Sequence, residues 1–132
     1  MTRRLEDFLT RYCESFRKGN AAVAAAFYHE PAVMIFADRM MVLDTRADIT
    51  RALDRILTEL IERGFSHSVV DVVHVIPLTA GTALISATFS RLRGDGGVLE
   101  RMGATYTVIE ADGDCKIACI VAHAVDRVIR TV

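Results

Sequence analysis

The stretch TALISATFSRLRGDGGVLERMGATYTVIE, residues 82–110, decides the fold. It holds two strand-like runs separated by GDGG, whose glycines and aspartate favour the unusual dihedral angles of a tight turn. Two further runs flank it: SVVDVVHVI (68–76), which is followed by PLTAG, and KIACIVAHAV (116–125), which is preceded by ADGD. Strands joined by such short connections pair as antiparallel hairpins, so this half of the chain predicts a four-stranded meander. Gly103 interrupts the third run and indicates a bulge or a bend.

The region before the meander is predicted to begin with two helices. An apolar stripe at helical spacing starts at Leu5 and stops near Gly19. Asn20 is placed to cap a second, short helix, which we expect to run through Tyr28. This helix must end before Pro31, because the residue that precedes a proline is disfavoured in the helical region.

A third helix and two short strands complete the predicted first half. Thr45 and Asp48 resemble a capping box at the start of the helix, and Gly64 is a natural stop at its end. The segments AVMIFAD (32–38) and RMMVLD (39–44) predict two short strands or one bent strand. The apolar stripe of the third helix comprises Ile49, Leu53, Ile56, Leu57, Leu60 and Ile61.

Helices followed by an antiparallel meander are typical of an α+β fold. We expect residues 1–132 to form a single domain, in which a curved antiparallel sheet wraps around three helices from the N-terminal half. This arrangement is cone-shaped and leaves a cavity between the sheet and the helices. The strand at 116–125 is apolar on both faces, so the outer face of the sheet also needs cover. A homodimer packed through the sheet supplies that cover.

Composition excludes several classes of partner. The chain has 132 residues, of which 52% are hydrophobic, and its 16 basic and 17 acidic side chains are interspersed and leave a net charge of -1. A nucleic-acid-binding protein normally gathers its basic residues on one face, so we expect no nucleic-acid partner. No apolar run approaches the roughly 20 residues of a membrane span, and the N-terminus lacks the apolar stretch of a signal peptide. We therefore expect a cytoplasmic protein without a membrane partner.

The three cysteines are predicted to be free thiols. Cys13, Cys115 and Cys119 form an odd set. The last two are four residues apart on a predicted strand, which separates them by about 13 Å at roughly 3.3 Å per residue. That separation is too long for a disulfide bond.

The order of these elements, together with RYCESFRKGNAAVAAAFYHEPAVMIFAD (11–38) and ADGDCKIACIVAH (111–123), resembles the nuclear-transport-factor-2-like superfamily, within its SnoaL-like branch. The resemblance covers nearly the whole chain and implies a cystatin-like or ketosteroid-isomerase-like cone. Members of the superfamily include ketosteroid isomerases, polyketide cyclases and dehydratases, so the resemblance implies a fold without choosing an activity.

The resemblance to the isomerases implies a tyrosine on the first helix, an aspartate base on the first strand and a late acid. Tyr12 matches the tyrosine. The position of the base holds Phe36, with Asp38 two residues further along the same strand face, and the late acid falls near ATYTV (104–108), which has no carboxylate. A proton shuttle needs its base, so a steroid isomerase is excluded.

Three polar residues are candidates for acid/base chemistry: Tyr12, Asp38 and His123. If His123 faces the cone, the three groups converge on one apolar cavity, as catalysis requires. Strand alternation groups His123 with Ile117, Cys119 and Val121, but a bulge would exchange the two faces, so both orientations remain open. The simpler interpretation is a histidine at a strand end or dimer interface that is hydrogen-bonded to a backbone carbonyl.

The wall of the cone supplies the candidate ligand-binding residues. Arg91 shares a strand face with Phe89 and is suited to hold a ligand carboxylate. The full set is Phe16, Met34, Phe36, Phe89, Arg91, Met102 and Tyr106.

We expect no metal, because the four histidines lack ligand spacing, and no cofactor, because no phosphate-binding loop follows a strand. The predicted function is the binding of a small apolar molecule. The alternatives are a cofactor-independent acid/base enzyme, such as an isomerase, polyketide cyclase or dehydratase, and an interaction module that acts through the sheet face.

Overall fold

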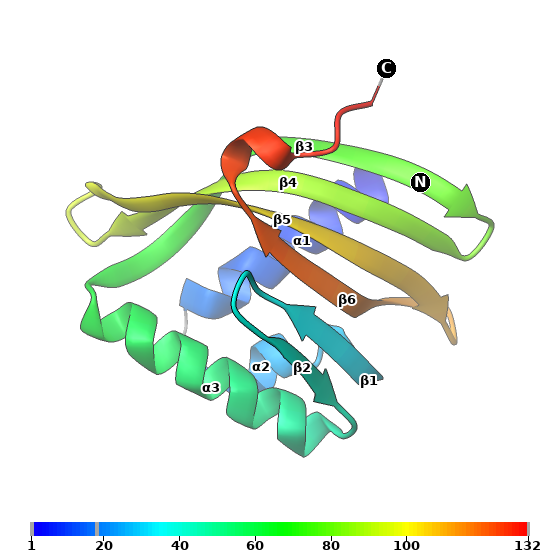
Figure 1. Ribbon diagram of the computed structural model, residues 1–132, viewed down its shortest axis with the longest axis horizontal. Helices are drawn as coiled ribbons and strands as arrows, with labels where there is room; N and C mark the ends of the chain where they lie inside the picture. Colours follow the sequence, from blue (N-terminus) through cyan, green and yellow to red (C-terminus); the bar gives the residue numbers. More distant parts are fainter. Residues whose placement is uncertain (1, 18, 132) are drawn as a thin grey trace.

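Three α-helices pack against one face of a curved six-stranded sheet (Figure 1). The computed structural model describes residues 2–17 and 19–131. Its elements are α1 (Thr2–Arg17), α2 (Ala21–Ala25), β1 (Tyr28–Ile35), β2 (Met40–Leu43), α3 (Arg46–Glu62), β3 (Phe65–Thr79), β4 (Thr82–Arg93), β5 (Val98–Ala111), β6 (Asp114–His123) and the short 3-10 helix η1 (Val125–Arg127).

The sheet has the strand order β2-β1-β6-β5-β4-β3. Strands β3 to β6 form the predicted antiparallel meander, and Gly96 adopts a φ of 89° in the turn between β4 and β5. The predicted α+β class is therefore confirmed. The sheet is mixed, however, because β1 runs parallel to β6. These two strands are far apart in the sequence, so no hairpin constrains their direction.

The local signals for the first two helices are confirmed. The stripe of α1 buries Leu5, and the side chain of Asn20 accepts a hydrogen bond from the backbone N–H of Ala22 at the start of α2. The second helix ends at Ala25, earlier than predicted, because Tyr28 already belongs to β1 and pairs with β6.

The predicted capping box of α3 is also confirmed, since Thr45 and Asp48 exchange side-chain to backbone hydrogen bonds. Ile61, predicted to be buried, is instead 53% exposed. It lies in the last turn beside Gly19, where a Cβ would come within 3.7 Å of its Cδ1, so this neighbour has no side chain to cover it.

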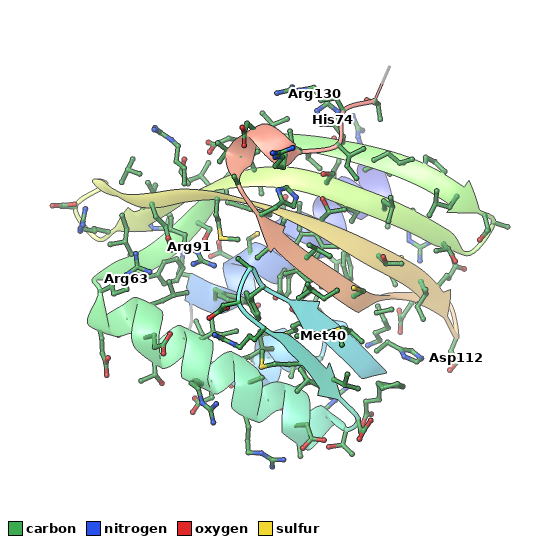
Figure 2. The ribbon with its side chains drawn as sticks, viewed as in Figure 1. Met40, Arg63, His74, Arg91, Asp112 and Arg130 are labelled. Atoms are coloured by element: carbon green, nitrogen blue, oxygen red, sulfur yellow. The ribbon has the colours of Figure 1, made fainter. Side chains whose placement is uncertain are left out.

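The core fills the space between the concave face of the sheet and the three helices (Figure 2). The most deeply buried large side chains come from all of these layers: Leu9, Met34, Ile49, Leu53, Leu57, Ile85 and Ile117. None of the described helices is long and apolar enough to cross a membrane.

Candidate ligand-binding site

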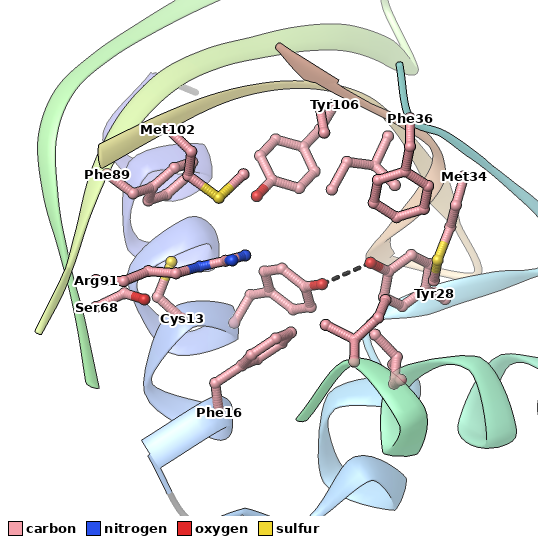
Figure 3. Close-up of a pocket in the computed structure, with 15 residues that line it drawn as sticks. Cys13, Phe16, Tyr28, Met34, Phe36, Ser68, Phe89, Arg91, Met102 and Tyr106 are labelled. Carbon is pink, nitrogen blue, oxygen red and sulfur yellow. Dashed lines mark hydrogen bonds between the residues drawn. The ribbon is translucent and has the colours of Figure 1, made fainter. Parts of the chain in front are cut away.

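A cavity of about 70 Å³ lies among α1, α3, β1 and the concave face of the sheet (Figure 3). All seven side chains predicted to bind a ligand line it, together with Tyr12. The lining residues that sequence reasoning missed are Cys13, Tyr28, Leu53, Ile56, Ser68, Ile120 and Ala122.

The lining divides into buried and partly exposed side chains. We call the buried set the floor: Tyr12, Tyr28, Met34, Leu53, Phe89 and Tyr106. We call four partly exposed side chains the rim: Phe16, Phe36, Arg91 and Met102. The floor is apolar apart from its three hydroxyl groups, and the rim carries one cation.

The three floor tyrosines form a cluster. The hydroxyl oxygens of Tyr12 and Tyr28 are hydrogen-bonded at 2.5 Å. The ring of Tyr12 also meets Tyr106 edge to face, with centroids 6.0 Å apart. The hydroxyl of Tyr106 points into the cavity and has no hydrogen-bond partner among the described residues (Figure 3). The cluster therefore presents hydroxyl groups toward any molecule that enters.

Burial makes these phenols harder to ionise than an ordinary tyrosine. It is the main cause that raises the pKa of Tyr12, Tyr28 and Tyr106 above the ordinary value. For Tyr28 the hydrogen bond with Tyr12 offsets part of the rise in pKa, and for Tyr106 the charge of Arg91 does so. An unperturbed tyrosine has a pKa of about 10, so all three are neutral near pH 7. They can donate hydrogen bonds but cannot act as bases there.

The rim cation, Arg91, belongs to a three-residue ion-pair cluster. Nη1 of Arg91 on β4 donates to Oε1 of Glu100 on β5 at 2.8 Å. Nη1 of Arg63, at the end of α3, donates to the same oxygen at 3.2 Å. Partial burial raises the pKa of Glu100, but the hydrogen bonds and charges of Arg91 and Arg63 outweigh it and lower the pKa overall. Two cations share one carboxylate, so the cluster carries one net positive charge.

Cys13 contributes a thiol to the same wall. Burial raises its pKa to about 12, and the charge of Arg91 offsets only part of this effect. The reactive form of a cysteine is the thiolate. Cys13 is therefore a weakly polar wall residue and not a nucleophile. All three cysteines are unpaired.

The structure does not bring the three candidate catalytic residues together. Tyr12 lies on the floor, but Asp38 lies between β1 and β2 and its side chain is 75% exposed, near Arg39 at 3.6 Å. It is not part of the cavity wall, because the backbone turns toward β2 just after Phe36. The predicted convergence of Asp38 with Tyr12 is wrong.

His123 lies on the outer face of the sheet. A bulge between Ile117 and Cys119 exchanges the faces of β6, so Ile117 is in the core while Ile120 and Ala122 line the cavity. His123, the next residue after Ala122, then points away from it. Of the two orientations of His123 that the sequence left open, the structure has the one that faces away from the cone, and the sheet separates His123 from Tyr12.

The environment of His123 matches the simpler interpretation made from the sequence. Its Nδ1 hydrogen-bonds the carbonyl oxygen of Ala124 at 2.8 Å, and its Nε2 hydrogen-bonds the hydroxyl of Thr105 at 2.8 Å. The hydroxyl of Thr105 is also hydrogen-bonded to the hydroxyl of Ser86, whose oxygen accepts a hydrogen bond from the backbone N–H of Ile129 at 2.8 Å. This network fastens the C-terminal segment to the outer face of the sheet.

Gly103 has a different role from the predicted bulge or bend. Its pairing with β4 and β6 shows no register shift, and its partner on β6 is His123. A Cβ at this position would lie 2.6 Å from two atoms of the imidazole ring. Glycine is therefore needed to make room for the histidine.

Among the described residues, no group of three or more histidine, cysteine, aspartate or glutamate side chains is placed to hold a metal ion. Alternation along the strand could not find the missed floor residue Tyr28. Ala32 and Met34 alternate toward the core, but Glu30 is exposed and the pairing with β6 shifts register between Tyr28 and Val33.

Comparisons with known proteins identify the fold. The family model described as "NTF2-like protein (DUF6841)" matches residues 3–125. No curated protein matches the chain. Among solved structures, an NTF2-like protein with a cystatin-like fold from Novosphingobium aromaticivorans is 15% identical, with a TM-score of 0.74 over 93% of this chain and 80% of its own.

Two other structures share the fold at similarly low identity. A putative calcium/calmodulin dependent protein kinase II association domain from Xanthomonas campestris is 18% identical, with a TM-score of 0.71 over 96% of this chain and 89% of its own. Aln2 from a Streptomyces species is 19% identical, with a TM-score of 0.74 over 92% of this chain and 89% of its own. The family match covers most of the chain and agrees with the resemblance found in the sequence, so the chain belongs to the NTF2-like family DUF6841.

Proposed function

We propose that the cavity binds a small, largely apolar molecule that carries an acceptor oxygen. The observation that carries this proposal is an apolar cavity whose deepest polar groups are protonated phenols. Ligand sites combine apolar walls with a few convergent polar groups that fix orientation. Here those groups are three hydroxyls and one guanidinium.

The hydroxyl hydrogens of the floor tyrosines that are free to donate indicate that the ligand carries a hydrogen-bond acceptor. Tyr12 and Tyr28 hold two hydroxyl hydrogens but use only one in the bond between them. The second hydrogen is free to donate, as is that of Tyr106. An incoming oxygen acceptor can take a hydrogen bond from these hydroxyls, whereas an ammonium group, which only donates, leaves both hydrogens without an acceptor.

The lining also explains why binding is favoured over acid/base catalysis. No carboxylate or imidazole belongs to the described cavity wall. General base catalysis needs such a group within hydrogen-bond reach of the proton that it removes. The tyrosines are suited to stabilise a developing negative charge, but the matching base is missing from the described wall.

The size of the cavity limits the ligand. Its volume of about 70 Å³ is less than half of the roughly 150 Å³ of an engineered apolar cavity that binds benzene. A ligand of a few heavy atoms fits without rearrangement. A longer one must extend past the rim or displace Met34 and Met102, whose flexible side chains adapt readily.

The test is a titration followed by NMR, with the methyl groups of Met34 and Met102 labelled with carbon-13. Butanone, which has an acceptor oxygen, is compared with butylammonium, which has only donors. Saturable shifts of both methyl signals are expected with butanone alone. Tyr106→Phe should weaken butanone binding by roughly fivefold to tenfold, the worth of one hydrogen bond.

Thr107→Val is the matched control, because it removes a hydroxyl from the residue next to Tyr106. Thr107 lies on the outer face of the sheet, where it pairs with Leu84 on β4 and Cys119 on β6. It should leave butanone binding unchanged. Shifts that never saturate, equal binding of butylammonium, or an unchanged affinity in Tyr106→Phe would each contradict the proposal.

A further inference from the structure

We infer that the acceptor of the ligand is a carboxylate, which binds Arg91 by displacing Glu100 from it. This inference rests on the proposed function and names the ligand class of the same cavity. It follows from the position of Arg91, from the way Glu100 is shared, and from the charge that the cluster leaves unbalanced.

Arg91 connects the cavity to the ion-pair cluster. It lies on β4 two residues after Phe89, and its guanidinium reaches toward the centre of the cavity (Figure 3). Its side chain is 21% exposed, so it retains little contact with solvent. Arg63 and Arg91 lie at the same end of the molecule (Figure 2). A cation in such a place interacts more strongly with an anion than one on an open surface.

Arg91 has N–H groups that no acceptor among the described residues engages. A guanidinium carries five N–H groups in a planar fork, and among the described residues only Nη1 of Arg91 is engaged by an acceptor, Oε1 of Glu100. A ligand carboxylate can therefore approach a free edge of the fork and form two parallel hydrogen bonds.

Glu100 can release Arg91 without losing its own partner. Its Oε1 also accepts from Arg63, so the glutamate stays ion-paired when the ligand takes its place on Arg91. The result is two ion pairs from two cations and two anions. The unliganded cluster has one cation more than it has anions, which favours an anionic ligand over a neutral one.

The floor tyrosines fit the same ligand class. Their hydroxyls donate hydrogen bonds, and a carboxylate offers two oxygens with about four acceptor positions. No carboxylate belongs to the described wall to repel it. The apolar side chains Phe89 and Met102 are placed to cover an aliphatic tail.

The experiment compares butyrate with butanone by the same methyl titration on the full chain. Wild-type protein should bind butyrate roughly tenfold more tightly, since hydrogen bonds to charged groups are stronger than neutral ones. Arg91→Gln should remove this preference, so that the variant binds butyrate no more tightly than it binds butanone. Arg101→Gln is the matched control, because Arg101 is exposed on β5 and pairs with Ser90 on the outer face.

The competing glutamate gives a second, independent readout. Glu100→Gln removes the charge that competes with butyrate for Arg91. Butyrate should therefore bind several-fold more tightly, while the affinity for butanone is unaffected. Arg63→Gln should have the opposite effect, because Glu100 then depends on Arg91 alone. If Arg91→Gln fails to fold, the opposite signs of these two variants decide the matter.

The outcomes separate this inference from the proposed function. Butanone binding without any preference for butyrate, or weaker butyrate binding in Glu100→Gln, would overturn the carboxylate assignment and leave the proposed function standing. Failure of both ligands to bind would overturn both.

Discussion

Replacing Gly103 with alanine should destabilise the protein, although alanine normally suits a strand better than glycine. The new Cβ would lie 2.6 Å from Cε1 and Nδ1 of His123 and 3.0 Å from the carbonyl oxygen of Ala124. The ring must move and give up its two hydrogen bonds, to Ala124 and to Thr105. Each is worth about 1 kcal/mol, against a gain of about 0.5–1 kcal/mol from replacing glycine. The net loss is about 1–1.5 kcal/mol.

Urea unfolding of four proteins measures this effect: wild type, Gly103→Ala, His123→Ala and the double variant. Once the ring is gone, Gly103→Ala should cost little or stabilise the protein, which gives a coupling energy of about 1–2 kcal/mol. Equal destabilisation by Gly103→Ala in both backgrounds would refute the reasoning. The imidazole would then not lie over Gly103 on the outer face.

Three further outcomes are expected. Tyr28→Phe should lower the free energy of unfolding by about 1–3 kcal/mol in urea, because it leaves the buried hydroxyl of Tyr12 without its partner; the Tyr12→Phe, Tyr28→Phe double variant should lose less than the sum of the single variants. A variant with Cys13 as its only cysteine should react slowly with a thiol reagent, because the pKa of this thiol is raised to about 12. At pH 8 the rate should be roughly a thousandfold below that of an ordinary thiol with a pKa of about 8.5, and it should rise about tenfold per pH unit. A rate like that of free cysteine would count against a buried thiol. The homodimer expected from the sequence should sediment as a dimer at micromolar concentration and dissociate in a Val42→Lys, Val72→Lys variant, since both valines are exposed on strands of the outer face; a monomeric wild type would contradict it.

The fold could be predicted from the sequence because its signals are local. The turn at GDGG, the cap at Asn20 and the capping box at Thr45 each act within a few residues, and the structure shows all three. The parallel pairing of β1 with β6 could not be predicted, because it joins segments about 85 residues apart and no local pattern encodes the direction. The end of α2 was misplaced for the same reason, since Tyr28 is drawn into β1 by its pairing with Ile117.

The cavity wall was easier to predict than the position of single polar groups. Alternation along β4 and β5 places Phe89 and Tyr106 inward, and the structure agrees. The face of His123 depends on a bulge at Ala118, and a bulge of one residue reverses every side chain after it. The predicted position of Asp38 in the cavity was wrong because alternation stops where the strand ends, and β1 ends at Ile35.

A crystal structure of the full chain soaked in butanone tests the central claim most directly. The ketone should lie inside the cavity, with its oxygen at hydrogen-bond distance, roughly 2.5–3.0 Å, from the hydroxyl of Tyr106, and with its carbon chain against Phe89 and Met102. A cavity that holds only water at saturating ketone, or a ketone whose oxygen meets no tyrosine hydroxyl, would contradict it.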